Sequence, residues 1–430
     1  MICDNLSIKE GHLNFAGCDT LYLAKEYGTP LYAMDENKVR SNCRAYTRAL
    51  SKHFGDRCLA LYASKALCIK EMYGIITSEN MGIDVVSSGE IYTAVAAGFD
   101  MSKAVFHGNN KTPYDIDFAI QNKVGFIVCD NADELPLIEN AAKKAGVKQN
   151  ILIRVTPGID PHTHDKINTG CVDSKFGVSV YGGAAFDVTK QALACQDVAL
   201  KGFQFHVGSQ LFDPTPFLQA IDVMTDFMVL IKDELAYDCE ILDIGGGIGV
   251  RYVEAEPQPD IEAFIDSIAK ELIGCCDKKS LTLPFVCMEP GRSIVANAGI
   301  TLYTVGSVKE IPDVKNYVAI DGGMADNPRY TLYSAPYTVI NATKADKPND
   351  YTCTVVGRCC ESGDVIQRNL KMPKPVPGDI LAVLTTGAYN YSMASNYNAL
   401  LKPPIIMIND GKAHISVRRE TFEDLIACQK

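Results

Sequence analysis

The sequence has little of what would place a protein in a membrane or on a nucleic acid. None of its apolar runs approaches the length of a membrane span, so we expect no transmembrane segment. Asp and Glu (52) outnumber Lys and Arg (41), and the net charge of −11 disfavours binding to nucleic acid or to anionic membranes, because both need basic patches. Residues 1–6 lack the basic and apolar segments of a secretory signal. We therefore predict a soluble, cytoplasmic protein. Tryptophan is also absent, which has no functional meaning.

Cysteine is abundant, at 16 residues, but the patterns that would give it a structural role are missing. No repeated CxxC pair offers a zinc site, and we predict no metal. A long chain without a secretory signal is also a poor candidate for disulfides. Cysteines within apolar runs, such as Cys58, Cys129 and Cys287, are expected to be small core residues.

What is present is a regular alternation that begins near residue 38. Short apolar runs end in polar or glycine-rich stretches, and helix-like segments separate one run from the next. Eight such repeats favour a (β/α)₈ TIM barrel, and the alternative is an open, doubly wound α/β sheet. The predicted strands are Cys58–Ser64, Gly82–Ser87, Lys103–Gly108, Gly125–Cys129, Ile151–Thr156, Gly202–Val207, Glu240–Ile244 and Pro284–Met288.

The spacing of apolar residues also predicts individual helices and a second domain. Apolar residues recur every three or four positions over 217–235, which indicates one helix with a continuous apolar face. Acidic residues at 133 and 134 indicate a helix start. Residues 1–34 show no clear amphipathic helix. Past residue 299, short β-rich runs separated by turns predict a mostly antiparallel β-domain. We predict a barrel over residues 35–298 and a β-domain built from residues 1–34 and 299–430.

The carboxyl ends of the predicted barrel strands carry an unusual set of polar residues, and that end is where barrels place their chemistry. The first run ends at Lys65, where partial desolvation would lower the pKa of the amine and make it a nucleophile. Taken alone, a solvated lysine at the start of a surface helix is the commoner case. Asp84 lies inside the second run, His206 ends the sixth and Glu289 follows the eighth. A satisfied core histidine is the alternative for His206.

A glycine cluster, Gly245–Gly249, follows the seventh run. Backbone N–H groups of glycines can approach an anion closely, and a following helix start would add a favourable dipole. A tight strand-to-helix turn is the alternative. Gly291 and Arg292, in the loop after the eighth run, could contact the same anion, and an arginine guanidinium is well matched to a phosphate. A lysine amine, a phosphate-binding loop, an imidazole and a carboxylate at one barrel mouth are the parts that the cofactor pyridoxal 5'-phosphate requires.

Several motifs occur together and in order over nearly the whole chain. They are YASKA around Lys65, HGNNKT at 107–112, SKFG at 174–177, HVGSQ at 206–210, GGGIG at 245–249, EPGR at 289–292, CESGD at 360–364 and GAY at 387–389. With these motifs the chain resembles the alanine-racemase-like barrel family of pyridoxal-phosphate decarboxylases.

The resemblance implies roles for residues of the barrel. Lys65 would hold the cofactor as a Schiff base, His206 would stack on the pyridine ring, and Glu289 would pair with the pyridine nitrogen. Asp84 matches an aspartate close to the cofactor, and for Glu90 the alternative is a residue that only starts a helix. The residues implied around the phosphate are Ser209, Gly245, Gly246, Gly247, Gly291 and Arg292, with Tyr389 reaching the cofactor from the β-domain.

The resemblance also implies substrate contacts from the β-domain. Arg329 and Tyr333 match residues that bind the distal carboxylate of the substrate, and Cys360 matches the residue that protonates the carbanion after CO₂ leaves. A solvated arginine and a buried thiol are the alternatives for Arg329 and Cys360. The family is expected to work as a homodimer in which Cys360 and Glu361 enter the neighbouring active site. The residues expected at the substrate are Arg292, Arg329, Tyr333, Glu361, Ser362 and Tyr389.

The pyridine-nitrogen partner discriminates between the reactions open to such a site. A carboxylate such as Glu289 keeps the nitrogen protonated and favours decarboxylation. In racemases of this fold, the resemblance instead implies an arginine as the partner of that nitrogen. Non-catalytic cofactor binders of the fold lack the β-domain.

Glu361 with Arg329 and Tyr333 could hold both an ammonium and a carboxylate, which describes meso-2,6-diaminopimelate. We therefore expect its decarboxylation to L-lysine, the last step of lysine biosynthesis. The alternative substrates are ornithine, arginine and carboxynorspermidine.

Overall fold

A computed structural model describes residues 2–159 and 174–430, which divide into two compact units. One unit comprises Asn42–Gly249 and Gln258–Gly291, and the other comprises residues up to Ser41, Val250–Pro257 and Arg292–Lys430. We call them the barrel unit and the β unit.

The barrel unit is a closed parallel sheet. Its strands pair in the order in which they follow along the chain, and β13 pairs with β5 to close the ring. This confirms the predicted TIM barrel and excludes the open sheet. The strands are β5 (Cys58–Ala63), β6 (Gly82–Val85), β7 (Ala104–Phe106), β8 (Phe126–Cys129), β9 (Gln149–Thr156), β11 (Val198–Gln204), β12 (Ile241–Asp243) and β13 (Phe285–Met288). The two-residue strand β10 (Val178–Ser179) pairs in parallel with β9.

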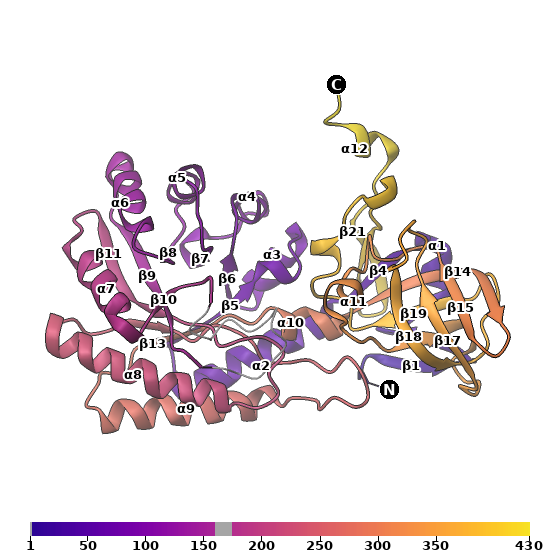
Figure 1. The fold of residues 1–430 in the computed structure, drawn as a ribbon, viewed down its shortest axis with the longest axis horizontal. Helices are drawn as coiled ribbons and strands as arrows, with labels where there is room; N and C mark the ends of the chain where they lie inside the picture. Colours follow the sequence, from indigo (N-terminus) through magenta and orange to yellow (C-terminus); the bar gives the residue numbers. More distant parts are fainter. Residues whose placement is uncertain (1, 160–173) are drawn as a thin grey trace. The chain divides into compact units, whose positions relative to one another are not determined.

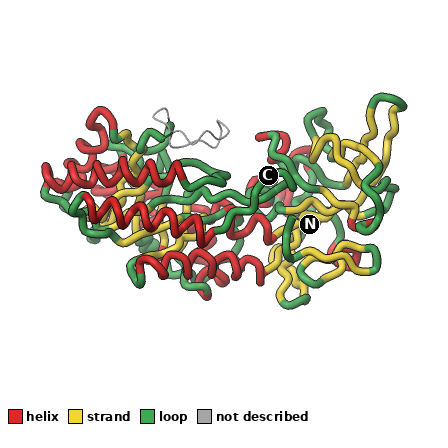
Figure 2. Tube along the Cα trace, turned by 90° about the horizontal axis from the view of Figure 1, so that it is seen from below, coloured by secondary structure: helices red, strands yellow, loops and turns green. Residues whose placement is uncertain are grey.

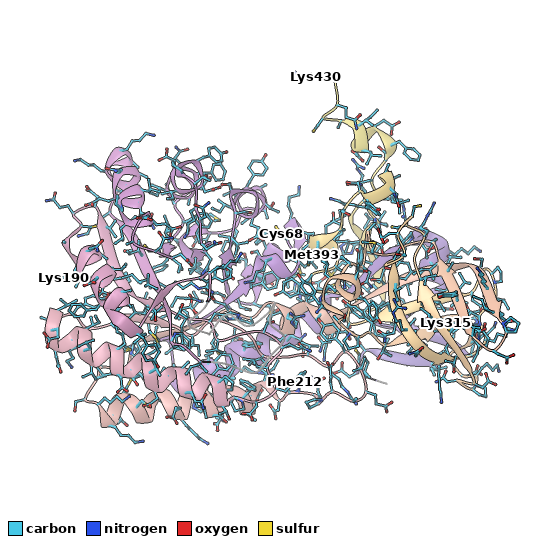
Figure 3. The ribbon with its side chains drawn as sticks, in the orientation of Figure 1. Cys68, Lys190, Phe212, Lys315, Met393 and Lys430 are labelled. Carbon is cyan, nitrogen blue, oxygen red and sulfur yellow. The ribbon has the colours of Figure 1, made fainter. Side chains whose placement is uncertain are left out.

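Helices surround this sheet, as Figure 1 and Figure 2 show. They are α2 (Glu36–Phe54), α3 (Lys70–Ser78), α4 (Ser88–Ala96), α5 (Pro113–Gln121), α6 (Glu134–Ala145), α7 (Ala184–Ala194), α8 (Thr215–Leu235) and α9 (Ile261–Lys278). The expected apolar face of α8 is confirmed, because Phe217, Met224 and Ile231 are all buried. The predicted helix start is confirmed as well, since α6 begins at Glu134. Outward-facing residues such as Lys190 on α7 are exposed (Figure 3).

Side chains fill the barrel, so its interior is a packed core. Leu61, Val105, Val128, Leu152 and Cys287 form a buried cluster contributed by five different strands. Cys129 is also buried and Cys58 is partly buried, as expected of small core residues. Because the interior is filled, polar groups that act on a ligand must lie at a strand end.

The β unit is a mostly antiparallel sheet with two parallel pairings, β15 with β17 and β4 with β20. Its longest strand, β14, pairs with β4, β15 and β19. The strands are β4 (Leu31–Asp35), β14 (Gly299–Ile311), β15 (Lys315–Ile320), β16 (Val339–Asn341), β17 (Tyr351–Val356), β18 (Val365–Met372), β19 (Ile380–Leu384), β20 (Ile405–Asn409) and β21 (Lys412–Val417). A small antiparallel sheet is formed by β1 (Leu6–Lys9), β2 (His12–Phe15) and β3 (Cys18–Asp19).

The N-terminal segment contains a helix that the sequence did not predict. Helix α1 spans Thr20–Tyr27. The side chain of Asp19 accepts a hydrogen bond from Leu21 N at 2.8 Å, and Gly28 ends the helix at φ +71°. Its buried face is short, including Leu23 and Ala24. Local capping therefore forms this helix, where periodicity gave no signal. Across residues 2–159 and 174–430, none of the helices combines the length and apolar character needed to cross a bilayer.

Candidate active site

Lys65 lies just beyond the carboxyl end of β5, in the short 3-10 turn Ser64–Ala66. Its side chain is 48% exposed, and Nζ lies 4.0 Å from Oδ2 of Asp84 on the neighbouring strand β6. Asp84 itself is buried. The amine is therefore open to a ligand and also faces a buried carboxylate.

Glu289, directly after β13, is held as a buried anion. Oε1 is in close contact with Nε2 of His107, and Oε2 accepts a hydrogen bond from Nε2 of Gln204 at 3.0 Å. Burial by itself would raise the pKa of Glu289, but His107, followed by Lys65 and His206, outweighs it and lowers the pKa to about 2. A carboxylate that stays ionised can act as the partner of a protonated ring nitrogen.

Asp84 has a different electrostatic environment from Glu289. Nε2 of His107 lies 3.9 Å from Oδ1 of Asp84. Burial raises the pKa of Asp84, and the charge of His107 offsets this only in part. Two neighbouring carboxyl groups with opposite pKa shifts are a common property of catalytic sites. Among the described residues, Asp84, His107 and Glu289 also have ligand atoms within 4.8 Å of one another.

His206 follows β11 and is partly buried. Burial, together with the charges of Lys65 and Arg154, lowers its pKa to about 3. The imidazole is therefore neutral near pH 7. A neutral, partly accessible ring at a strand end fits stacking against an aromatic ligand better than it fits the alternative of a core histidine.

The glycine loop lies between the loops that follow β11 and β13. Gly245 has φ +69°, and its N–H donates to Oδ1 of Asp243 at 2.9 Å. A Cβ added at Gly246 would lie 2.1 Å from the backbone oxygen of Glu289, so only glycine fits there. Leu211 N donates to Gly247 O at 2.9 Å, which places the loop containing Ser209 beside the glycines. The expected helix start is absent in this part of the structure, because α9 begins only at Ile261. A helix dipole therefore cannot assist anion binding at this loop.

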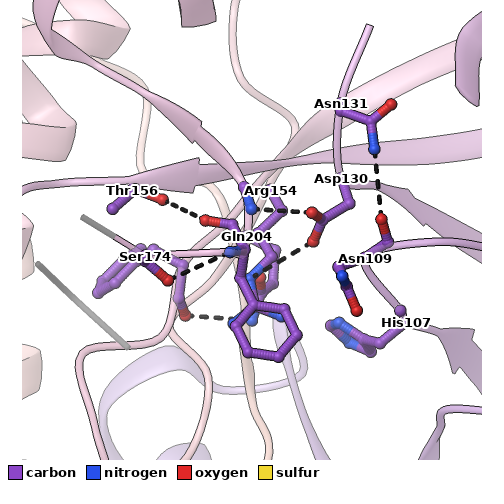
Figure 4. A network of polar contacts seen from close by, with 12 residues as sticks. His107, Asn109, Asp130, Asn131, Arg154, Thr156, Ser174 and Gln204 are labelled. Atoms are coloured by element: carbon purple, nitrogen blue, oxygen red, sulfur yellow. Dashed lines mark hydrogen bonds and ion pairs between the residues drawn. The ribbon is translucent and has the colours of Figure 1, made fainter. Parts of the chain in front are cut away.

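Arg154, on β9, is a site residue that the sequence reasoning missed. Its guanidinium stacks on the Phe176 ring at 4.5 Å, and Nε lies 3.9 Å from Oδ1 of Asp130 (Figure 4). Oδ2 of Asp130 accepts from Gly177 N at 2.9 Å, and Thr156 donates to Phe176 O at 2.7 Å. This network joins the SKFG segment to β8 and β9. A single charged residue inside the apolar run at 151–156 was the signal that could have identified it.

A second polar cluster lies within the β unit. Nη1 of Arg292 donates to the hydroxyl of Tyr252 at 3.0 Å, and its guanidinium lies 4.8 Å from the Tyr389 ring. Arg329 is 8% exposed, so the alternative of a solvated arginine is wrong. Its guanidinium lies 4.9 Å from the Tyr252 ring, and Nη1 donates to the hydroxyl of Tyr337 at 2.9 Å. Sequence reasoning identified the arginines and Tyr389 but neither Tyr252 nor Tyr337.

Tyr333 and Glu90 lie in less distinctive surroundings. Helix α11 (Arg329–Tyr333) carries Tyr333 at its end, partly exposed. Glu90 is in the first turn of α4, where its N–H donates to Ser87 Oγ at 3.2 Å and its carboxylate accepts from Val86 N at 2.8 Å. Glu90 therefore lies in the first turn of α4, which begins at Ser88 and is capped by Ser87.

The CESGD segment forms an exposed loop of the β unit. Cys360, Glu361 and Ser362 are exposed, whereas Cys359 is buried, so the alternative of a buried thiol applies to Cys359 and not to Cys360. The loop is anchored by Asp364, which is buried and accepts from Cys359 N at 2.8 Å and from Met324 N at 2.7 Å. An anchored loop with exposed reactive groups at its tip can present them to a ligand or to another subunit.

The residues of the barrel unit fit pyridoxal phosphate. The structure brings together an accessible lysine amine, an ionised buried carboxylate and a neutral imidazole, at the same end of the barrel as the glycine loop. These are the groups that the aldehyde, the ring nitrogen, the ring face and the phosphate of the cofactor would respectively require.

Comparison with known proteins gives a consistent result. Residues 36–296 match the family model of the pyridoxal binding domain of pyridoxal-dependent decarboxylases. The chain is 40% identical to the diaminopimelate decarboxylase of Bacillus subtilis strain 168, over 97% of this chain and 95% of that protein. It is 39% identical to that of Staphylococcus aureus strain COL, over 97% of both chains.

Solved structures agree with these relatives. The structure of the diaminopimelate decarboxylase from M. jannaschii in complex with L-lysine superposes with a TM-score of 0.93 at 35% identity, covering 100% of this chain and 98% of that one. The Helicobacter pylori enzyme complexed with L-lysine superposes with a TM-score of 0.87 at 32% identity, covering 95% and 98%. The chain therefore belongs to the diaminopimelate decarboxylases, within the family of pyridoxal-dependent decarboxylases.

Proposed function

We propose a set of residue roles for the reaction of this family, the decarboxylation of meso-2,6-diaminopimelate to L-lysine and CO₂. The observation that carries the proposal is the buried, ionised Glu289 on the same barrel rim as the accessible amine of Lys65. Bound pyridoxal phosphate supplies a ring that accepts the electron pair left when CO₂ departs. Glu289 keeps the ring nitrogen protonated, which favours this reaction over racemisation.

Other residues of the chain bind and orient the cofactor. Lys65 binds it covalently, the neutral ring of His206 supports one face, and Asp84 lies beside the lysine. The close contact between His107 and Glu289 keeps that carboxylate ionised when a ring lies against it. The groups that bind the phosphate are Ser209, Gly245, Gly246, Gly247, Gly291 and Arg292, with Tyr389.

Substrate recognition is assigned to the β unit. Arg329 is buried, and its guanidinium contacts the ring of Tyr252 and the hydroxyl of Tyr337. A buried cation of this kind is suited to the carboxylate that the substrate retains. Tyr333, Arg292 and Tyr389 assist it, and Glu361 with Ser362 binds the distal ammonium. The thiol of Cys360 gives its proton to the carbon that has lost CO₂.

Substrate choice is tested by assaying one preparation against several amino acids. The purified holoenzyme should release CO₂ and L-lysine from meso-2,6-diaminopimelate. It should release no CO₂ from L-lysine, L-ornithine or L-arginine. These amino acids have no second carboxylate, so they leave the group that binds it, Arg329, without a partner. Faster turnover of ornithine, arginine or carboxynorspermidine would reject diaminopimelate as the substrate and leave the cofactor assignment standing.

We also propose that two copies of the chain share their active sites. The exposure of Cys360 and Glu361 on an anchored loop supports this arrangement, because the loop can reach outward from its own subunit. In the proposed dimer, the barrel domain over residues 35–298 binds the cofactor. The β-domain, formed by residues 1–34 and 299–430, contributes contacts to the substrate and to the other subunit. The cytoplasmic location stays a prediction.

Shared sites predict that two inactive variants complement each other. A Lys65→Ala chain mixed with a Cys360→Ala chain should recover up to about a quarter of the wild-type activity, because random pairing gives half heterodimers, each with one intact site. Activity is measured after dissociating and reassociating the mixed chains. A mixture of Lys65→Ala with Lys65→Ala/Cys360→Ala is the control and should stay inactive. No recovery in the first mixture would contradict shared sites.

A further inference from the structure

Tyr252 contacts both arginines of the polar cluster in the β unit. Its hydroxyl accepts a hydrogen bond from Arg292 at 3.0 Å, while its ring faces the guanidinium of Arg329 at 4.9 Å. Tyr252 is 3% exposed and comes from Val250–Pro257, the short segment that the barrel sequence contributes to the β unit. One buried side chain therefore contacts two cations by two different groups, its oxygen and its ring.

The two arginines form a buried concentration of positive charge. Arg292 is 9% exposed and Arg329 is 8% exposed. Like charges in a low-dielectric environment repel each other, so they need electron-rich neighbours. The hydroxyl and the ring face of a tyrosine supply these without a full negative charge. Although burial acts to raise the pKa of Tyr252, the charges of Arg329 and Arg292 outweigh it and lower that pKa, which agrees with this role.

Tyr252 is itself held in place by its neighbours. Its ring packs edge-on against Tyr337, with centroids 5.5 Å apart at 83°. The hydroxyl of Tyr337 accepts from Arg329 at 2.9 Å and from Nδ2 of Asn390 at 3.2 Å. The backbone oxygen of Tyr252 accepts from Thr338 Oγ1 at 2.9 Å. Tyr252 and Tyr337 together fix the orientation of Arg329 from two sides.

We propose that Tyr252 is a specificity-determining positioning residue, which sets Arg292 and Arg329 to bind the carboxylate that the substrate keeps. The proposal rests on the proposed function and deepens it. Two fixed guanidinium groups match the two oxygens of a carboxylate. An amine without that carboxylate leaves the buried cation of Arg329 without an anion beside it, so the same arrangement disfavours it.

The test compares two inhibitors of the holoenzyme that differ in this carboxylate. L-lysine, the product, retains it, whereas cadaverine lacks it. In Tyr252→Phe, which loses only the hydroxyl, the inhibition constant of L-lysine and the KM for meso-2,6-diaminopimelate should rise about tenfold, equivalent to roughly 1.4 kcal/mol. The inhibition constant of cadaverine and the visible absorption of the bound cofactor should not change. Tyr337→Phe should shift L-lysine binding in the same direction but less.

Tyr237→Phe is the matched control. It removes a partly buried tyrosine hydroxyl that donates to Leu200 O at 3.2 Å in the barrel unit, and it should leave both inhibition constants unchanged. The proposal is wrong if Tyr252→Phe leaves L-lysine binding unchanged, or if it weakens L-lysine and cadaverine equally. Failure of the proposed function appears separately, in a wild-type enzyme that does not turn over diaminopimelate. The inference then fails with it.

Discussion

Replacing Lys65 by alanine is expected to abolish decarboxylation of meso-2,6-diaminopimelate and to remove the visible absorption of the purified protein. Lys65 Nζ is an accessible amine on a barrel rim crowded with buried ionisable groups, and it faces Asp84 at 4.0 Å. Without it the cofactor has no covalent attachment, and we expect kcat to fall by at least about 10³-fold. The measurements are an absorption spectrum and a CO₂-release assay on the same sample.

Lys70→Ala is the control for this experiment. Lys70 is exposed at the start of α3, five positions further along the chain, and its loss should change neither the spectrum nor kcat. A Lys65→Ala protein that kept its yellow colour after dialysis, together with wild-type turnover, would show that another amine holds the cofactor.

The second large effect is expected from Glu289→Gln. Glutamine has the shape of glutamate and can still contact Gln204, but it carries no negative charge to stabilise a protonated ring nitrogen. Removing one preorganised polar group from an active site typically costs about 10²- to 10³-fold in kcat, and we expect a loss of that size. Because the pKa of Glu289 is lowered to about 2, the carboxylate is ionised at all working pH values. The loss should therefore be the same from pH 6 to pH 9.

Two outcomes would oppose this role of Glu289. One is an unchanged kcat, and the other is a defect that disappears at one end of the pH range. Glu262→Gln is a suitable control, because Glu262 is exposed on α9 and forms a surface pair with Arg48 at 3.6 Å. Such a pair contributes little, so this variant should retain wild-type activity.

The barrel could be predicted from the sequence because its information is local. Each strand is a short apolar run, and each is followed by a periodic helix, so β5 and α8 are recognisable without any knowledge of their partners. The groups at the strand ends follow from the topology, since parallel strands place their carboxyl ends on one rim. Lys65, Asp84, His206 and Glu289 could therefore be proposed before any contact was known.

The features that sequence reasoning missed depend on contacts distant along the chain. Tyr252 lies in a loop with no periodicity, and its importance appears only when Arg292 and Arg329 are found beside it. Arg154 was overlooked because it lies in a run that was correctly predicted as a strand. That prediction rests on the apolar residues of the run and gives no weight to the single charged residue among them. Strand β4 was missed for a similar reason: all five of its residues are buried and its partners lie far along the chain.

The pairing of β4 has a consequence for how the protein is made. On the ribosome, Leu31–Asp35 is among the first segments to emerge, but it pairs with β14 (Gly299–Ile311) and with β20 (Ile405–Asn409) near the end of the chain. At roughly 5–20 residues per second, the nascent β4 waits on the order of 20–70 s for that last partner. During that time a strand whose five residues are all buried in the folded protein is without its sheet. The barrel can fold in the interval, whereas the β unit can be completed only when synthesis is nearly finished. A chain truncated before Ile405 should therefore yield a folded barrel with an incomplete β unit.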